Sequence, residues 1–190
     1  AYGPYKNLKD IVDAAKANPE KVNVGTTGPL SNGHIVPLRL QNLAGVKYAY
    51  VTFAGGADIT TAVLGGHIDA GGSSAGEAMS PYKSGTLRVL GTTGKDQSKF
   101  FPDVKTFAAQ GYQVFNSYDI GIAAPAGPPP EIVAVLSAAV KRATQTDYLK
   151  EKFNSTGMVP NYMDPAQYSA HWAEYESQVA PIIELGKQVQ

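Results

Sequence analysis

The chain has 190 residues, and its 16 basic and 16 acidic side chains cancel, which argues against a nucleic-acid partner because such proteins usually carry excess positive charge. The absence of cysteine excludes disulfide bonds, thiolate metal sites and thiol nucleophiles. Gly and Pro interrupt the apolar stretches before the roughly 18 to 20 residues that a membrane-spanning helix needs, and the 20 Gly and 13 Pro indicate the many connections of an α/β chain.

The first half of the chain repeats one order of elements: a strand, a turn of small residues and a helix. A first amphipathic helix is predicted by the spacing of Leu8, Ile11, Val12 and Ala15. Pro37 is unfavourable inside a helix, so that helix either begins near His34 or is kinked. Strands are predicted at residues 22–24, 48–53 and 68–70, and helices at residues 35–44 and 58–64.

The second half is predicted to be mainly helical. A strand at residues 88–92 precedes a loop and short helix at residues 101–111, and a crossing strand is predicted at residues 117–124. Helices follow at residues 132–140, 148–153 and 168–182. The last of these has one apolar stripe, which the periodicity assigns to the core: Tyr168, Trp172, Tyr175, Val179 and Ile182.

The small-residue turns favour an anion site. Backbone N–H groups at a helix N-terminus are unpaired and carry positive partial charge, so a carboxylate or phosphate can bind there. Hydroxyl groups from Thr26, Thr27 and Ser31 would add hydrogen bonds in the first turn. The alternative is that Ser31 or Asn32 merely caps a helix.

One stretch also matches an enzyme motif. Residues 72–76 read G-x-S-x-G with Ser74 as the nucleophile, and His171 follows several aspartates in the order that a serine hydrolase requires. Such short matches arise easily in a chain rich in Gly, Ala and Ser, so we rank this hydrolase second, as the alternative function. The three histidines are too far apart in sequence to predict a zinc site, and neither G-x-G-x-x-G nor a P-loop is present, so no metal or cofactor is expected.

Several stretches resemble the motifs of one family. Residues 50–58, Tyr-Val-Thr-Phe-Ala-Gly-Gly-Ala-Asp, and residues 64–70, Leu-Gly-Gly-His-Ile-Asp-Ala, are similar to V-P-Y-K-G-G … L-x-G-G-x-x-D. Residues 28–34 are similar to the turn G-x-G-S-x-x-H. Further motifs agree in the same order at residues 8–19, 85–90, 101–106 and 121–133. Over nearly its whole length the chain therefore resembles the Bug/TctC-type extracytoplasmic solute-binding proteins of tripartite tricarboxylate transporters.

The resemblance implies an α/β fold of the type II periplasmic-binding-protein, or Venus-flytrap, architecture, with a small carboxylate in the cleft between two lobes. It implies a periplasmic protein that delivers its ligand to a membrane permease and has no catalytic residue. Residues 1–4 do not read as a signal peptide, so the signal of an exported protein would already be removed. By position, the resemblance implies these ligand-binding residues: Thr26, Thr27, Gly28, Ser31, His34, Phe53, Gly55, Gly56, Ser73, Ser74 and Tyr118.

The chain departs from the family in two ways. Thr52, Phe53 and Ala54 replace the family's Pro, Tyr and Lys, which removes a cation. Members of the family also begin with a further stretch, which supplies a Gly-rich carboxylate-binding loop and much of the first lobe. By the resemblance, residue 1 of this sequence aligns after that stretch. Residues 1–115 are therefore expected to form a complete second lobe, and residues 116–190 a helical part that returns to a partial first lobe. A partial lobe would expose apolar faces, which predicts a homodimer.

Overall fold

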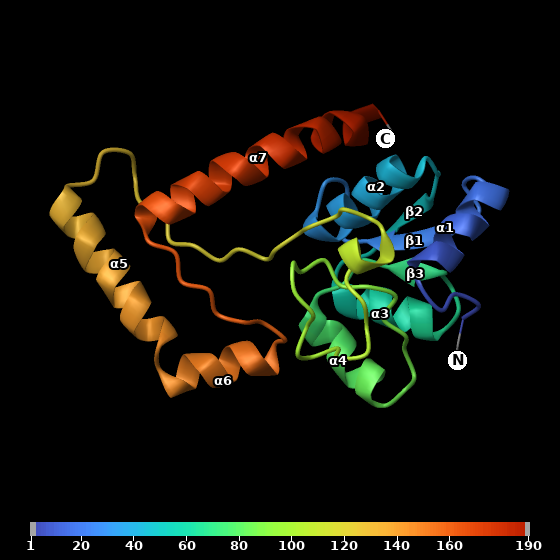
Figure 1. Ribbon diagram of the computed structural model, residues 1–190, viewed down its shortest axis with the longest axis horizontal. Coiled ribbons are helices and arrows are strands. Elements are labelled where there is room, and N and C mark those ends of the chain that lie inside the picture. The colour runs from blue at the N-terminus through green and yellow to red at the C-terminus, as the bar shows by residue number, and fades with distance from the viewer. Residues whose placement is uncertain (1–2, 189–190) are drawn as a thin grey trace. The chain divides into compact units, whose positions relative to one another are not determined.

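The computed structural model describes residues 3–188, and Figure 1 shows its helices and strands. It divides into two units. Unit 1 holds the described residues up to Tyr118 together with the stretch from Ile182 onward, and unit 2 is Asp119–Pro181. The first unit thus ends three residues beyond the expected boundary, and the end of the chain belongs to it as well. The assignment of these units to the lobes of a larger protein stays a prediction.

Unit 1 contains a three-stranded parallel sheet in the order β2-β1-β3. Its strands are β1 (Asn23–Thr26), β2 (Ala49–Thr52) and β3 (Ala70–Gly71), near the three predicted positions. Thr26 pairs with Thr52 across β1 and β2, and Gly25 pairs with Gly71 across β1 and β3. The carboxyl ends of all three strands therefore lie level at one edge of the sheet.

Helices cover both faces of the sheet (Figure 1). On one face, α1 (Leu8–Ala17) and α2 (Asn32–Ala44) pack with Val24 in the larger apolar core. On the other face, α3 (Gly56–Leu64) packs Ile59 in a second core cluster. The helix α4 (Ala75–Lys83) follows β3. A parallel sheet buried by helices on two faces is the arrangement of α/β proteins, which confirms the predicted class.

Glycines let two isoleucines, Ile59 on α3 and Ile68 before β3, pack close to the sheet. A Cβ atom on Gly71 would lie 2.1 Å from the Ile59 side chain, and one on Gly25 would lie 2.6 Å from the Ile68 side chain. Because these two strand positions carry no side chain, the isoleucines rest directly on the backbone of β1 and β3. This packing places the N-terminus of α3 beside the carboxyl ends of the strands.

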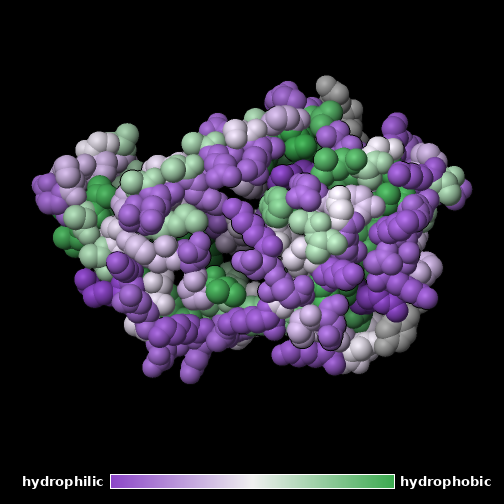
Figure 2. Space-filling model, in the orientation of Figure 1, coloured by the Kyte–Doolittle hydropathy of each residue, from purple (hydrophilic) through white to green (hydrophobic). Residues whose placement is uncertain are grey.

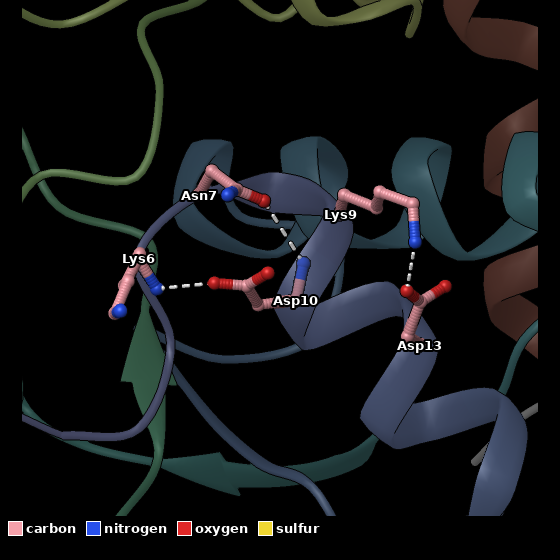
Figure 3. A network of polar contacts seen from close by, with 5 residues as sticks. All are labelled: Lys6, Asn7, Lys9, Asp10 and Asp13. Carbon is pink, nitrogen blue, oxygen red and sulfur yellow. Dashed lines mark hydrogen bonds and ion pairs between the residues drawn. The ribbon is translucent and has the colours of Figure 1, made fainter.

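The N-terminus of α1 follows its local sequence (Figure 3). The Asn7 side chain accepts a hydrogen bond from the Asp10 backbone N–H at 3.0 Å, and the Asp10 carboxylate accepts one from the Lys6 backbone N–H at 2.7 Å. Lys9 and Asp13 form an ion pair one turn apart on the exposed face. The predicted first helix is therefore capped by the residues that precede it.

The strand predicted at residues 88–92 is wrong. Within it, only Thr92 forms a β-bridge, with Thr106. The Leu90 carbonyl accepts instead from the Gln110 side chain at 2.9 Å, and Gln110 ends a short 3₁₀ helix, η1 (Ala108–Gln110). A side chain therefore satisfies the backbone group that a neighbouring strand would have satisfied.

Unit 2 is built from α5 (Pro130–Thr144), α6 (Asp147–Ser155) and most of α7 (Pro165–Gln188). These helices cover the three predicted stretches, but α5 and α6 contain no buried residue. Among residues 3–188, no helix combines the length and apolar character needed to cross a membrane.

Two expectations about the second half are wrong. Residues 117–124 are exposed and form no strand, because no strand in the described part of the chain pairs with them. The apolar stripe of the last helix is buried only at its end: Val179 and Ile182 are buried, whereas Trp172 is 53% exposed. Helical periodicity located this stripe, but burial also requires a core on the other side.

Candidate functional site

Three turns and three helix N-termini meet at the carboxyl edge of the sheet in unit 1. The first turn follows β1 and leads to the α2 N-cap residue Ser31, the second leads to Gly55 before α3, and the third leads to Ser74 before α4. Phe53 N–H bonds to the Thr26 carbonyl at 2.9 Å and Gly72 N–H bonds to the Gly25 carbonyl at 3.1 Å. The sheet pairing therefore continues into the second and third turns and fixes them beside β1.

The first turn is held in an uncommon backbone conformation. The Ser31 N–H bonds to the Gly28 carbonyl at 3.2 Å, with Pro29 and Leu30 between them. Leu30 has a φ of 58°, in the left-handed region that a branched or bulky residue rarely adopts. Its N–H donates to the Nδ1 atom of His34 at 2.9 Å. Its side chain lies against Gly186 near the end of α7, where an added Cβ would be 2.5 Å away.

His34 is buried inside this turn. It is 6% exposed, and its ring packs edge-on against Tyr50 with centroids 4.5 Å apart. Because Nδ1 accepts a hydrogen bond, the neutral ring carries its proton on Nε2. Nε2 and the nearby Ser31 hydroxyl are both buried without a described hydrogen-bond partner. Burial lowers the pKa of His34 below its ordinary value.

The turns also touch one another directly. A Cβ atom on Gly72 would lie 2.3 Å from the Gly33 carbonyl oxygen, so the first and third turns meet backbone to backbone. Pro37, one turn into α2, has no N–H with which to bond that same carbonyl four residues earlier. The helix begins at Asn32, two residues before the His34 start that would have placed Pro37 in its first turn. The proline therefore lies inside the helix.

Glu77 lies where the second and third turns meet. Its Oε2 atom accepts from the Ser74 backbone N–H at 2.9 Å, the Ser74 hydroxyl at 2.7 Å and the Ser73 hydroxyl at 3.0 Å. A Cβ on Gly56 would lie 2.2 Å from the same oxygen. Burial favours a raised pKa, but the hydrogen bonds from Ser74 and Ser73 outweigh it and lower the pKa of Glu77, so the group is an anion at neutral pH.

The electrostatics of the edge come from backbone dipoles. Each helix N-terminus carries a positive partial charge of about half a unit, and α2, α3 and α4 all begin here. The three turns and the first turns of the helices that follow them contain two acidic side chains, Asp58 and Glu77, and no Lys or Arg. Among residues 3–188, no group of His, Asp and Glu could hold a metal ion. The arrangement can hold a small anion by N–H and O–H donors.

The structure brings ten of the eleven predicted residues together. Thr26, Thr27, Gly28, Ser31 and His34 lie in or beside the first turn; Phe53, Gly55 and Gly56 in the second; and Ser73 and Ser74 in the third. Thr26 is 2% exposed, so its side chain is buried at the end of β1. Tyr118 is 67% exposed, and no described hydrogen bond or ring contact joins it to the turns.

The hydrolase alternative gains no support from the geometry. Ser74 caps α4 with an ordinary extended backbone, φ −72° and ψ 156°, rather than the strained turn of a nucleophile elbow. Its hydroxyl bonds to Glu77. His171 bonds to Asp119 at 2.8 Å within unit 2, and no hydrogen bond described for the chain joins Ser74 to a histidine.

A hollow of about 490 Å³ lies elsewhere on unit 1. Its lining includes Lys16, Glu20 and Lys47, which precede β1 and β2 in the chain. It therefore lies toward the amino ends of the strands. Ligands of open α/β sheets bind at the carboxyl ends, so the three turns are the better candidate.

Sequence reasoning missed two contributors to the site. The position of Glu77 could have been predicted from the sequence, because Ser74 and Glu77 have the spacing of a capping box. The structure contains this capping box. The left-handed Leu30 carried no such signal, because the residue against which it packs, Gly186, lies far away in the sequence.

Comparison with known proteins identifies the family. The model of the TctC family, described as the tripartite tricarboxylate transporter family receptor, matches residues 1–187. A curated Cupriavidus necator protein, the UPF0065 protein in the gbd 5′ region, is 32% identical over 185 residues, covering 97% of this chain and 56% of its own length. The chain thus spans a little over half of this relative.

Solved structures agree on the fold. A TctC solute-binding protein from Polaromonas superimposes with a TM-score of 0.78 at 27% identity, over 95% of this chain and 62% of its own. MatC from Rhodopseudomonas palustris, solved with bound malate, superimposes with a TM-score of 0.75 at 24% identity, over 95% of this chain and 63% of its own. These matches confirm the periplasmic-binding-protein fold class. The chain belongs to the TctC family of solute-binding receptors.

Proposed function

We propose that this chain provides a non-catalytic binding surface for a small carboxylate at the carboxyl edge of the β2-β1-β3 sheet. The observation that carries this proposal is the convergence of the N-termini of α2, α3 and α4 on three contiguous turns. Their N–H groups and the hydroxyl groups of Thr27 and Ser31 are donors suited to a carboxylate. Hydrogen bonds to a charged group contribute about 1.5–3 kcal/mol each, so useful affinity needs no cation.

The comparisons support the ligand class by analogy. The Rhodopseudomonas palustris relative was solved with malate, which is a carboxylate. Membership of a transporter-receptor family supports a periplasmic location and delivery of the ligand to a membrane permease as parts of the same proposal. A second copy of the chain, bound through the exposed apolar faces of unit 2, is a further proposed partner.

The direct test is thermal unfolding with a panel of mono-, di- and tricarboxylates. A ligand at 100 times its Kd raises the free energy of unfolding by about 2.7 kcal/mol, so the midpoint should rise with concentration. Gly55→Glu should abolish the shift, because it places a carboxylate at the N-terminus of α3, where the glycine has open space. Ala17→Glu makes the same charge change at the end of α1 and should leave the shift intact.

A panel that gives no shift at any concentration would contradict carboxylate binding by this chain. Covalent labelling by a fluorophosphonate that disappears in Ser74→Ala would support the hydrolase instead.

A further inference from the structure

One carboxylate already lies in the proposed site. The Oε2 atom of Glu77 accepts three hydrogen bonds, from the Ser74 backbone and from the hydroxyl groups of Ser73 and Ser74. Both of its carboxylate oxygens lie within 2.4 Å of the position that a Cβ on Gly56 would take. Glu77 thus lies at the N-termini of both α3 and α4, and a permanent anion neutralises part of their positive partial charge.

The N-terminus of α2 differs from the other two. Its N-cap residue, Ser31, makes no side-chain hydrogen bond to the helix backbone, and its hydroxyl oxygen is buried without a described partner. The first turn, residues 26–34, contains no acidic side chain. A ligand carboxylate therefore meets unpaired donors at α2, whereas it meets a fixed negative charge at α3 and α4.

The Oε1 atom of Glu77 can accept further hydrogen bonds. All three described hydrogen bonds of Glu77 go to Oε2, and Oε1 takes part in none of them. An unpaired carboxylate oxygen beside an anion site favours a ligand that offers a hydrogen-bond donor there and disfavours a second ligand anion. Neither Lys nor Arg occurs in the three turns to offset this preference.

We propose that Glu77 determines specificity in this site: it selects a carboxylate ligand that bears a hydrogen-bond donor, best a cationic one, and it rejects a dicarboxylate whose second charge reaches the same place. The ligand carboxylate binds at the N-terminus of α2, and its donor group binds the Oε1 side of Glu77. This inference rests on the proposed carboxylate-binding function.

The test uses straight-chain carboxylates of two to six carbons that end in a methyl, hydroxyl, ammonium or second carboxylate group, with Kd measured by calorimetry. At the best chain length, the wild type should bind the ammonium-terminated ligand at least tenfold more tightly than the dicarboxylate, with the hydroxyl-terminated ligand between them. In Glu77→Gln this ratio should fall at least tenfold, while the affinity for the methyl-terminated ligand stays the same.

Gln at position 77 keeps the capping box with Ser74, so α4 should remain capped. Glu20→Gln is the matched control, because it removes an equal charge from an exposed residue toward the amino ends of the strands, and it should leave the ratio unchanged. The wild-type series alone tests the proposal should Glu77→Gln fail to fold.

The outcomes separate the two proposals. If no carboxylate binds the wild type, the proposed function is wrong. If carboxylates bind but the wild type prefers the dicarboxylate, or Glu77→Gln keeps the wild-type ratio, carboxylate binding stands and the role of Glu77 is wrong.

Discussion

His34 links the candidate site to pH. Its Nδ1 atom accepts the Leu30 N–H, so a second proton on the ring would place two donors against each other at 2.9 Å. Burial lowers the pKa of His34 in the folded protein, whereas the unfolded chain keeps a value of about 6.5. The unfolded state therefore binds more protons at mildly acidic pH. The contribution of His34 to the free energy of unfolding is therefore fully present above pH 6.5 and is lost as the pH falls below it.

We expect the urea midpoint of the wild type to decrease from pH 7.5 to pH 5, and this decrease to be smaller in His34→Gln. His67→Gln removes an exposed imidazole and is the control. Its urea midpoint should decrease as much as that of the wild type. Equal pH dependence in His34→Gln and the wild type would contradict this assignment.

Gly72 allows two turns of the site to touch. Any side chain at this position would meet the Gly33 carbonyl, a backbone atom that can move only with the start of α2. Gly72→Ser should therefore lower the free energy of unfolding by about 1–3 kcal/mol, the usual range for overpacking. Gly55→Ser is the matched control, since its φ of −163° suits serine and nothing lies within 4 Å. Denaturant titration measures both variants, and equal midpoints would show that the backbone contact is not required.

At the scale of single residues, the sequence predicted the positions of the three turns better than the contacts within them. Small residues after β-branched runs predicted the three turns, because strand ends and helix starts have local signals. The roles of Leu30 and Glu77 depend on contacts that local patterns do not encode: Leu30 lies against Gly186, and Glu77 lies against Gly56.

Among the helices, α1 has the clearest local stop and start signals. Asn7 accepts the Asp10 N–H as its N-cap (Figure 3), and Asn18 ends the helix before Pro19. Asn7→Ala should lower the free energy of unfolding by about 1 kcal/mol, the typical loss for an N-cap. Lys9→Ala breaks the exposed pair with Asp13 in the same helix and should leave stability unchanged, because such pairs contribute little. Circular dichroism during urea titration would compare the two variants, and an equal loss in both would refute the capping role.

Helices were more predictable than strands for a physical reason. A helix satisfies its backbone within one segment, so periodicity and caps located α1, α5 and α6. A strand needs a partner, and within residues 3–188 no neighbouring strand pairs with residues 88–92 or 117–124. At Leu90 the Gln110 side chain takes the partner's place.

At the scale of the whole molecule, exposed apolar side chains concentrate in unit 2. Of the large hydrophobic residues described as exposed, unit 1 contributes Leu43, Leu64 and Tyr118. The others all belong to unit 2: Ile120, Ile122, Ile132, Val135, Leu136, Tyr148, Val159 and Trp172. Figure 2 shows apolar side chains on the surface over α5. Sequence periodicity assigned one of these residues, Trp172, to a core, but the described part of unit 2 does not supply one.

Burial of such an exposed apolar face is favourable by about 25 cal/mol for each Å² of apolar surface removed from water. We therefore expect the chain to self-associate through unit 2. Size-exclusion chromatography with light scattering should show a mass that rises with concentration toward a dimer. The variant Val135→Gln/Trp172→Gln, which changes residues 65% and 53% exposed, should weaken the dimer at least tenfold, or about 1.4 kcal/mol. Leu43→Gln alters a residue 55% exposed in unit 1 and should leave the dimer intact. A chain that stays monomeric at high concentration would show that these faces do not bind a second copy.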